Sequence, residues 1–108
     1  MRVVAGKWGG RVLRAPRGLT VRPTGDRVRE AVFGILGDRV EGASVLDLFA
    51  GTGAMALEAL SRGAAGAVLV ESSPEALEVA GRNVQRHRVA NITLLAGSWY
   101  EPSAAVRV

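Results

Sequence analysis

The sequence predicts an α/β fold in which a partial parallel sheet, with helices on both faces, follows an N-terminal β-hairpin. Strand-like apolar runs alternate with helix-like segments across residues 45–95, a pattern that is typical of parallel β-α-β units. The runs at 45–49 and 67–70 are almost wholly apolar, which indicates strands covered on both faces. Two short β-prone runs at 2–5 and 11–14 enclose several glycines, which indicates a hairpin.

The first predicted helix follows a loop. Prolines and glycines break regular structure across residues 15–25. Asp26 is the expected N-cap of a helix that ends at Leu36, before a glycine. Apolar residues recur at helical spacing and predict one buried stripe. The stripe comprises Val28, Ala31, Val32, Ile35 and Leu36.

The β-α-β units begin with the strand at 45–49. A glycine turn leads from it into a helix at 53–62, which a further glycine ends. The strand at 67–70 leads into a second helix, with Ser73 as its N-cap and Pro74 at its first position, where both residue types are favoured.

A third strand is predicted at 91–95, and the residues beyond Gly97 are expected to form an irregular tail. Three parallel strands make only half of a doubly wound sheet. We therefore divide the chain into a basic N-terminal hairpin and loop, residues 1–25, and the N-terminal half of a larger α/β domain, residues 26–108.

The composition excludes several classes of function. The 108 residues contain no cysteine and one histidine, which excludes disulfides, thiolate metal sites, cysteine nucleophiles and histidine-based metal clusters, so no metal is expected. No apolar run approaches the roughly 20 residues of a membrane span. The N-terminus is charged too early for a signal peptide, so a cytoplasmic location is expected.

Positive charge is concentrated in the first part of the chain. Residues 1–30 carry eight basic and two acidic side chains, a balance of +6, whereas residues 31–108 carry six basic and eight acidic ones, a balance of −2. A basic segment ahead of a neutral body favours a polyanionic partner, because bound phosphates release counterions. A solvated basic surface is the alternative interpretation.

The stretch Gly51-Thr52-Gly53-Ala54-Met55-Ala56 fits the dinucleotide-binding pattern G-x-G-x-x-A. Asp47 lies near the end of the strand that leads into it, four positions before Gly51. A carboxylate there would repel a pyrophosphate by about 1 kcal/mol or more per close pair, and would attract an ammonium group. S-adenosylmethionine carries an ammonium group and no phosphate. The position of Asp47 therefore favours S-adenosylmethionine over NAD.

Glu71 ends the next strand, about 20 residues beyond the glycines, where an acidic side chain binds both ribose hydroxyls. This role is common to NAD and S-adenosylmethionine sites. Glu71 therefore predicts a ligand with an adenosine part without choosing between the two.

The motifs at residues 45–64, 22–33 and 2–11 together resemble those of one family, the bacterial 16S rRNA (guanine-N2)-methyltransferases of the small subunit. Residues 45–64, VLDLFAGTGAMALEALSRGA, resemble the family's motif I. Residues 22–33, RPTGDRVREAVF, resemble its RPTxDRVREALF signature, and residues 2–11, RVVAGKWGGR, resemble its N-terminal RIIxGxxxGR hairpin. The resemblance covers the first half of the family's length and implies a Rossmann-like methyltransferase fold.

This resemblance implies methyl transfer from S-adenosylmethionine to the exocyclic N2 of a guanine in 16S rRNA of the small ribosomal subunit. It assigns Asp47, Gly51 and Gly53 to the methionine part of the cofactor, Glu71 to the ribose and Ser72 to the adenine, with Phe49 and Thr52 in the same motif and Thr24 and Arg27 closing over the cofactor. The implied contacts to rRNA phosphates are Arg2, Lys7, Arg11, Arg14 and Arg22, and Trp8 could stack on a base.

The chain departs from the family in two places. Ser98 stands where the family often has an acid that contacts the adenine amino group. More importantly, the family's [DN]PPY motif, which orients the acceptor amino group, is absent from the 108 residues. Trp99-Tyr100-Glu101-Pro102 comes one strand too early to replace it. We therefore assign no catalytic residue and expect a chain truncated before the catalytic motif.

Three other interpretations stay open on the sequence. The chain could be a non-catalytic fragment that binds rRNA or a partner protein. It could be an NAD-dependent enzyme, since the glycine pattern occurs there also. It could also be a methyltransferase for another acceptor, such as DNA adenine or protein, because motif I is common to these enzymes.

Overall fold

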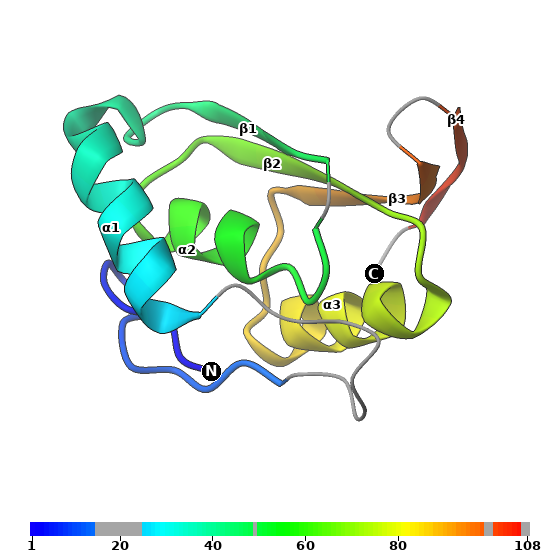
Figure 1. Cartoon of the computed structure of the whole chain (residues 1–108), viewed down its shortest axis with the longest axis horizontal. Coiled ribbons are helices and arrows are strands. Elements are labelled where there is room, and N and C mark those ends of the chain that lie inside the picture. The colour runs from blue at the N-terminus through cyan, green and yellow to red at the C-terminus, as the bar shows by residue number, and fades with distance from the viewer. Residues whose placement is uncertain (15–24, 49, 99–100, 107–108) are drawn as a thin grey trace.

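The β-α-β alternation builds a sheet with helices packed against it (Figure 1). The computed structural model describes residues 1–14, 25–48, 50–98 and 101–106. The strands are β1 (Ser44–Asp47), β2 (Gly66–Glu71), β3 (Ile92–Ser98) and β4 (Glu101–Val106). The helices are α1 (Asp26–Leu36), the 3₁₀ helix η1 (Gly37–Arg39), α2 (Ala54–Ser61) and α3 (Pro74–Arg86). None of the described helices is long and apolar enough to cross a membrane.

The first three strands run parallel, as the sequence predicts: β1 pairs with β2, and β2 with β3. The prediction of an irregular tail is wrong for residues 101–106, which form β4 antiparallel to β3. This segment has no strand pattern of its own, and the open edge of β3 supplies its partner. Residues 99–100 of the predicted tail lie outside the described part of the chain.

Helices α2 and α3 lie on the same face of the sheet (Figure 1), where α2 packs on β1 and β2 and α3 packs on β2 and β3. The predicted helices on both faces are therefore not found among the described elements. The reason is the strand order β1-β2-β3, because right-handed crossovers between strands in chain order place their helices on one face. Leu57 and Leu69 are buried between α2 and the sheet, whereas Leu46 of β1 is 61% exposed.

Helix α1 spans the predicted residues but begins differently. Its N-cap is Gly25, and its first residue is Asp26, the predicted cap. The Asp26 carboxylate instead forms an ion pair with Arg29 in the same turn. A charged partner within one turn therefore takes the place of the predicted cap hydrogen bond.

The predicted buried stripe of α1 is wrong. Val28 and Ile35 are 56% and 81% exposed, whereas Arg29 and Phe33 are buried. The physical reason is Glu58 of α2, a fully buried carboxylate that pairs with Arg29. A buried charge needs a partner, so this contact turns Arg29 inward and leaves the apolar stripe outside.

The N-terminal segment forms the predicted hairpin in a shortened form. Its antiparallel pairing reduces to one bridge, between Arg2 and Val12. The hairpin is held by its apolar side chains, because Val3, Trp8 and Leu13 are buried in the core. Packing against the helices therefore replaces the longer strand ladder that the sequence predicts.

Candidate functional site

The parallel strands bring two predicted acids to one edge of the sheet. Asp47 is the last residue of β1, and Glu71 is the last residue of β2. Asp47 pairs with Leu69, two residues before Glu71, so the two strands end at nearly the same level. Ligands of open α/β sheets bind outside the carboxyl ends of the strands, which makes this edge the candidate site.

The glycine turn between β1 and α2 is tight and packs against β2. Gly51 and Gly53 have φ values of 56° and 82°, which are unfavourable for residues that carry a Cβ. A Cβ at Gly53 would lie 3.2 Å from Leu69 Cδ2. The Gly53 N–H donates to the carbonyl of Ala50 over 2.8 Å. The turn therefore holds the backbone close to the ends of the two strands.

The Glu71 carboxylate is oriented by two backbone groups. Its Oε1 accepts from the Gly51 N–H and its Oε2 accepts from the Ser73 N–H, each over 2.7 Å. These bonds connect the glycine turn, the end of β2 and the start of α3. A carboxylate offers about four lone-pair sites, so Glu71 can still accept a pair of hydroxyl donors.

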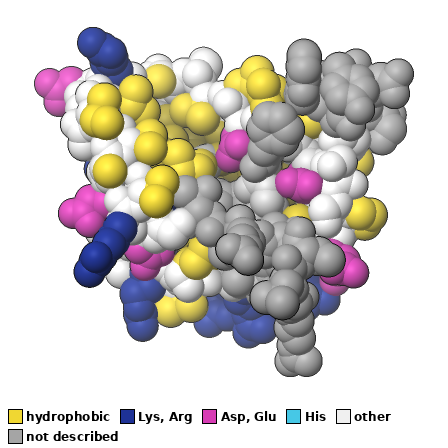
Figure 2. Space-filling model, in the orientation of Figure 1, with side chains coloured by type: hydrophobic (Ala, Val, Ile, Leu, Met, Phe, Trp, Pro, Cys, Tyr) yellow, Lys and Arg dark blue, Asp and Glu magenta, His cyan; other side chains and the backbone are white. Residues whose placement is uncertain are grey.

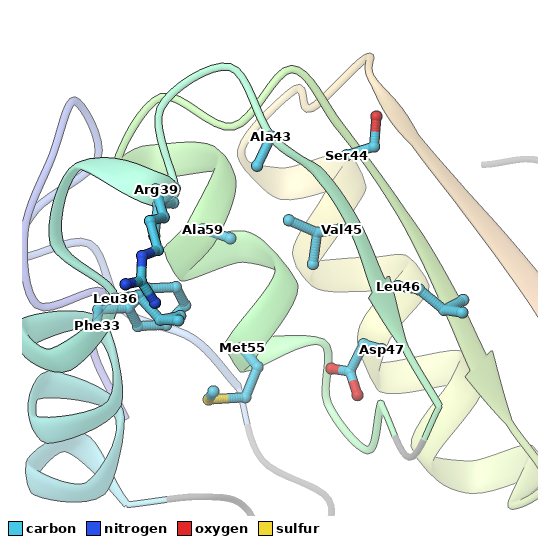
Figure 3. A pocket seen from close by; sticks show the side chains of 11 residues that line it. Phe33, Leu36, Arg39, Ala43, Ser44, Val45, Leu46, Asp47, Met55 and Ala59 are labelled. Atoms are coloured by element: carbon cyan, nitrogen blue, oxygen red, sulfur yellow. The ribbon is translucent and has the colours of Figure 1, made fainter.

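Asp47 lies at one end of a groove of about 380 Å³ between α1, β1 and α2. Figure 3 shows its carboxylate directed toward the space between β1 and the start of α2, where Met55 lies. Arg39 and Ser44 also line the groove, and the rest of its lining is apolar, including Phe33, Leu36 and Val45. Beside Asp47 itself, the carboxylate favours a cationic group and disfavours an anion.

The other predicted cofactor residues differ in how exposed they are. Ser72 is exposed directly after Glu71, and Thr52 is buried within the glycine turn. Arg27 is exposed in the first turn of α1. Thr24 and Phe49 lie outside the described residues.

The predicted RNA-binding residues lie on the surface wherever the structure describes them. The exposed residues are Arg2, Lys7, Arg11 and Arg14, and Arg22 lies outside the described ranges. Two of these side chains also have contacts within the hairpin. Arg2 donates to the carbonyl of Gly10 over 2.8 Å, and Lys7 Nζ lies 4.8 Å from the centre of the Trp8 ring.

The structure buries one aromatic and one basic residue of the N-terminal part. Trp8 is only 9% exposed and its ring is covered by Lys7, so the ring packs on the protein itself and is not available to stack on a base. Arg29 contributes to the positive balance of the N-terminal part, yet it is fully buried against Glu58 and cannot reach a phosphate. Both residues hold the hairpin and α1 on the core.

Two buried polar residues were missed by the sequence interpretation. Glu58 and Asn83 are both 0% exposed. Glu58 interrupts the apolar run AMALEAL, and that isolation is a signal that could have identified it. Asn83 stands among polar and apolar neighbours near the end of α3 and has no comparable local signal.

Comparisons with known proteins identify the family. The family model described as "Conserved hypothetical protein 95" matches residues 1–102. Over 99 residues the chain is 44% identical to "Ribosomal RNA small subunit methyltransferase D" of Escherichia coli K12, which covers 91% of this chain and 46% of that protein. Over 85 residues it is 38% identical to the protein of the same name from Haemophilus influenzae, covering 79% of this chain and 44% of that protein.

A solved structure agrees with this assignment. "Putative methyltransferase yhhF from Escherichia coli" superposes with a TM-score of 0.82 at 42% identity, over 91% of this chain and 53% of that one. The chain spans about half the length of the curated relatives it matches. The predicted Rossmann-like fold is thereby confirmed, and the chain belongs to the family described as conserved hypothetical protein 95, in agreement with its predicted resemblance to small-subunit rRNA methyltransferases.

Proposed function

We propose that this chain supplies the cofactor half of an enzyme that transfers a methyl group from S-adenosylmethionine to the exocyclic N2 of a guanine in 16S rRNA. The observation that carries the proposal is the pair of acids, Asp47 and Glu71, at the ends of neighbouring strands on either side of a glycine turn. The names of the small-subunit rRNA methyltransferases among its relatives support the RNA substrate. Such an enzyme would act on the small ribosomal subunit in the cytoplasm.

The residues at the sheet edge fit S-adenosylmethionine. The Glu71 carboxylate, oriented by the N–H groups of Gly51 and Ser73, would accept the two ribose hydroxyls. Asp47 would attract the ammonium group, and the tight glycine turn would hold the backbone after β1 close to the methionine part. When bound, the cofactor supplies a methyl group on a positively charged sulfur.

The remaining contacts are proposed from the family resemblance. Ser72 would lie near the adenine, directly after the ribose ligand Glu71. The residues proposed to complete the cofactor site are Thr52 and Phe49 in motif I, with Thr24 and Arg27 on the N-terminal side. The residues proposed to bind rRNA phosphates are Arg2, Lys7, Arg11, Arg14 and Arg22.

The same geometry argues against a dinucleotide. The Gly51 N–H donates to Glu71 and the Gly53 N–H donates to Ala50, so neither group is directed at a ligand phosphate. Phosphate loops present such N–H groups to the anion. Asp47 at the end of β1 would add like-charge repulsion of about 1 kcal/mol or more.

Calorimetric titration of the 108-residue chain with S-adenosylmethionine and, separately, with NAD tests this proposal. S-adenosylmethionine is expected to bind with measurable heat, and NAD to give none beyond dilution. Heat from NAD alone would contradict the assignment, because the site would then accept a pyrophosphate in spite of Asp47.

Asp47→Ala is expected to weaken S-adenosylmethionine binding by at least about 10-fold, because a hydrogen-bonded charge contributes about 1.5–3 kcal/mol. The matched control is Asp38→Ala, which removes the same charge from an exposed position in η1. Circular dichroism checks that both variants keep the helix content of the unaltered chain. Equal affinities for the two variants would remove Asp47 from the cofactor site.

The acceptor half of the site is proposed to come from further polypeptide. Among the described strands, none pairs with the outer edge of β1. The apolar side chains of Leu36 and Leu46, which line the groove along β1, are exposed. In doubly wound sheets the fourth parallel strand joins the sheet beside the first. The antiparallel β4 of this chain, which pairs with β3, is not that strand. We propose that a segment carrying the [DN]PPY motif adds its strand here and covers these side chains.

The 108-residue chain alone is therefore expected to transfer no methyl group to small-subunit particles, because it lacks the groups that orient the guanine amino group. Incubation with S-adenosylmethionine carrying a tritiated methyl group, followed by counting of the isolated rRNA, measures this. Turnover by the pure chain would show that the acceptor site lies within these residues.

A further inference from the structure

A second groove lies between the end of the N-terminal hairpin and the outer face of α3. It has a volume of about 490 Å³, and its lining consists of Arg14, Arg82, Gln85 and Arg86. All four residues are exposed. Three guanidinium groups and one amide therefore face this open space, and none of the described residues that line it is apolar; we call this feature the arginine groove.

The helix itself sets the spacing of two of these groups. Arg82 and Arg86 are four residues apart, so they lie on one side of α3, about 6 Å apart along its axis. Gln85 lies on the same side, three residues after Arg82. The groove therefore presents a short row of hydrogen-bond donors along the helix.

The third arginine is held against this row by hydrogen bonds of its backbone to α3. The Asn83 side chain accepts from the N–H of Arg14 over 2.9 Å and donates to its carbonyl over 3.0 Å. One turn later, His87 Nε2 lies 2.9 Å from the carbonyl of Val12. The backbone of Arg14 is thus attached to α3, and only its side chain needs to adapt to a ligand.

The positive charges of the arginine groove are largely available to a ligand. Arg82 pairs with Glu78 over 2.6 Å, but both side chains are about two-thirds exposed, at 65% and 63%. An exposed pair of this kind contributes little, so a ligand anion can displace Glu78. Within the described part of the chain, the guanidinium groups of Arg14 and Arg86 form no hydrogen bond or ion pair.

The groove also has a fixed relation to the candidate cofactor site. Asn83 donates to the carbonyl of Thr52 in the glycine turn over 3.1 Å, in addition to its two bonds with Arg14. One buried side chain therefore supports both the turn and the groove. Figure 2 shows Lys and Arg side chains gathered along the lower edge of the molecule, over the N-terminal segment and α3.

We propose that the arginine groove binds phosphates of the RNA backbone. The inference rests on the proposed action on rRNA and extends the phosphate contacts from the hairpin to Arg82 and Arg86 of α3. Guanidinium groups bind phosphate oxygens in bidentate geometry, and an open polar groove suits a continuous backbone better than an apolar ligand. The groove positions the RNA and reads no base.

The test measures binding of a fluorescein-labelled RNA hairpin by anisotropy at several salt concentrations. Arg86→Gln is expected to reduce the slope of log K against log salt by about 0.7–0.9, and R82Q/R86Q by about twice that amount. The matched control is Arg39→Gln, which changes an exposed arginine of η1 outside the arginine groove and should leave the slope unchanged. Because these side chains are exposed, circular dichroism should show unaltered folding.

Calorimetry with S-adenosylmethionine on the same samples separates the two proposals. If R82Q/R86Q binds the RNA hairpin with the slope of the unaltered chain, the arginine groove is not a phosphate site, whatever the cofactor result. If the unaltered chain fails to bind the RNA hairpin, the groove proposal is also overturned. If the slope falls as expected but S-adenosylmethionine does not bind, the groove stands and the proposed methyltransferase function fails.

Discussion

Replacing Glu58 by alanine is expected to lower the free energy of unfolding by about 3–5 kcal/mol, because the change removes a buried carboxylate that pairs with Arg29 and accepts from two backbone N–H groups. Glu58 and Arg29 are both fully buried, and Glu58 Oε1 lies 3.2 Å from an Arg29 nitrogen. The Glu58 carboxylate also accepts from the backbone N–H groups of Val4 and Ala5, over 2.7 and 3.0 Å. Arg62 donates a further bond to it over 2.9 Å.

The matched control is Glu78→Ala, since Glu78 and Arg82 form an ion pair with the same i,i+4 spacing as Glu58 and Arg62. Glu78 is exposed, and its loss is expected to change the free energy of unfolding by no more than about 1 kcal/mol. Urea unfolding followed by circular dichroism compares the two. A loss below about 1 kcal/mol for Glu58→Ala would contradict the importance given to its buried bonds.

Gly6→Ala is expected to destabilise the protein by about 2–5 kcal/mol, through a steric clash added to backbone strain. Gly6 has a φ of 87°, and a Cβ there would lie 2.0 Å from the carbonyl oxygen of Ser61 at the end of α2. Neither atom can move independently, because the Cβ is bonded directly to the backbone and the oxygen belongs to it. The hairpin would have to separate from α2 to accommodate the methyl group.

Gly10→Ala is the control for this clash. Gly10 lies in the same turn with a φ of 86°, but a Cβ there would have no atom within 4 Å. Its substitution should therefore cost only the backbone strain, about 1–2 kcal/mol. Urea unfolding of both variants gives the difference between them. Equal losses would mean that Gly6 is required for its conformation and not for close contact with α2.

Both predictions concern the attachment of the N-terminal hairpin. Glu58 and Ser61 of α2 bind its backbone from one side: Glu58 accepts from Val4 and Ala5, and Ser61 Oγ accepts from the Trp8 N–H over 2.9 Å. Because α2 also begins at the glycine turn, the hairpin and the candidate cofactor site belong to one packed unit. Basic residues on the hairpin are therefore held in a constant position relative to the cofactor site.

Much of the fold follows from local signals in the sequence. The apolar run ending in Asp47, the helix beginning at Ser73 and Pro74, and the strand ending in Glu71 lie within a residue or two of their predicted bounds. Each signal acts over a few residues: strand burial, capping hydrogen bonds and the permissive backbone of glycine. Asp47 and Glu71 could be placed at one sheet edge because parallel strands end together.

The tertiary structure decided which polar groups are buried and which apolar ones stay exposed. Asn83 binds the backbone of Arg14 across 69 residues of sequence, and Glu58 binds that of Val4 across 54. No periodicity within one helix can reveal such pairs, because the cost of burying a polar group depends on partners that only folding brings near. The sequence by itself thus determined the three parallel strands, the glycine turn and the family. Long-range pairing of buried charges decided which face of α1 turns inward and how the hairpin joins the core.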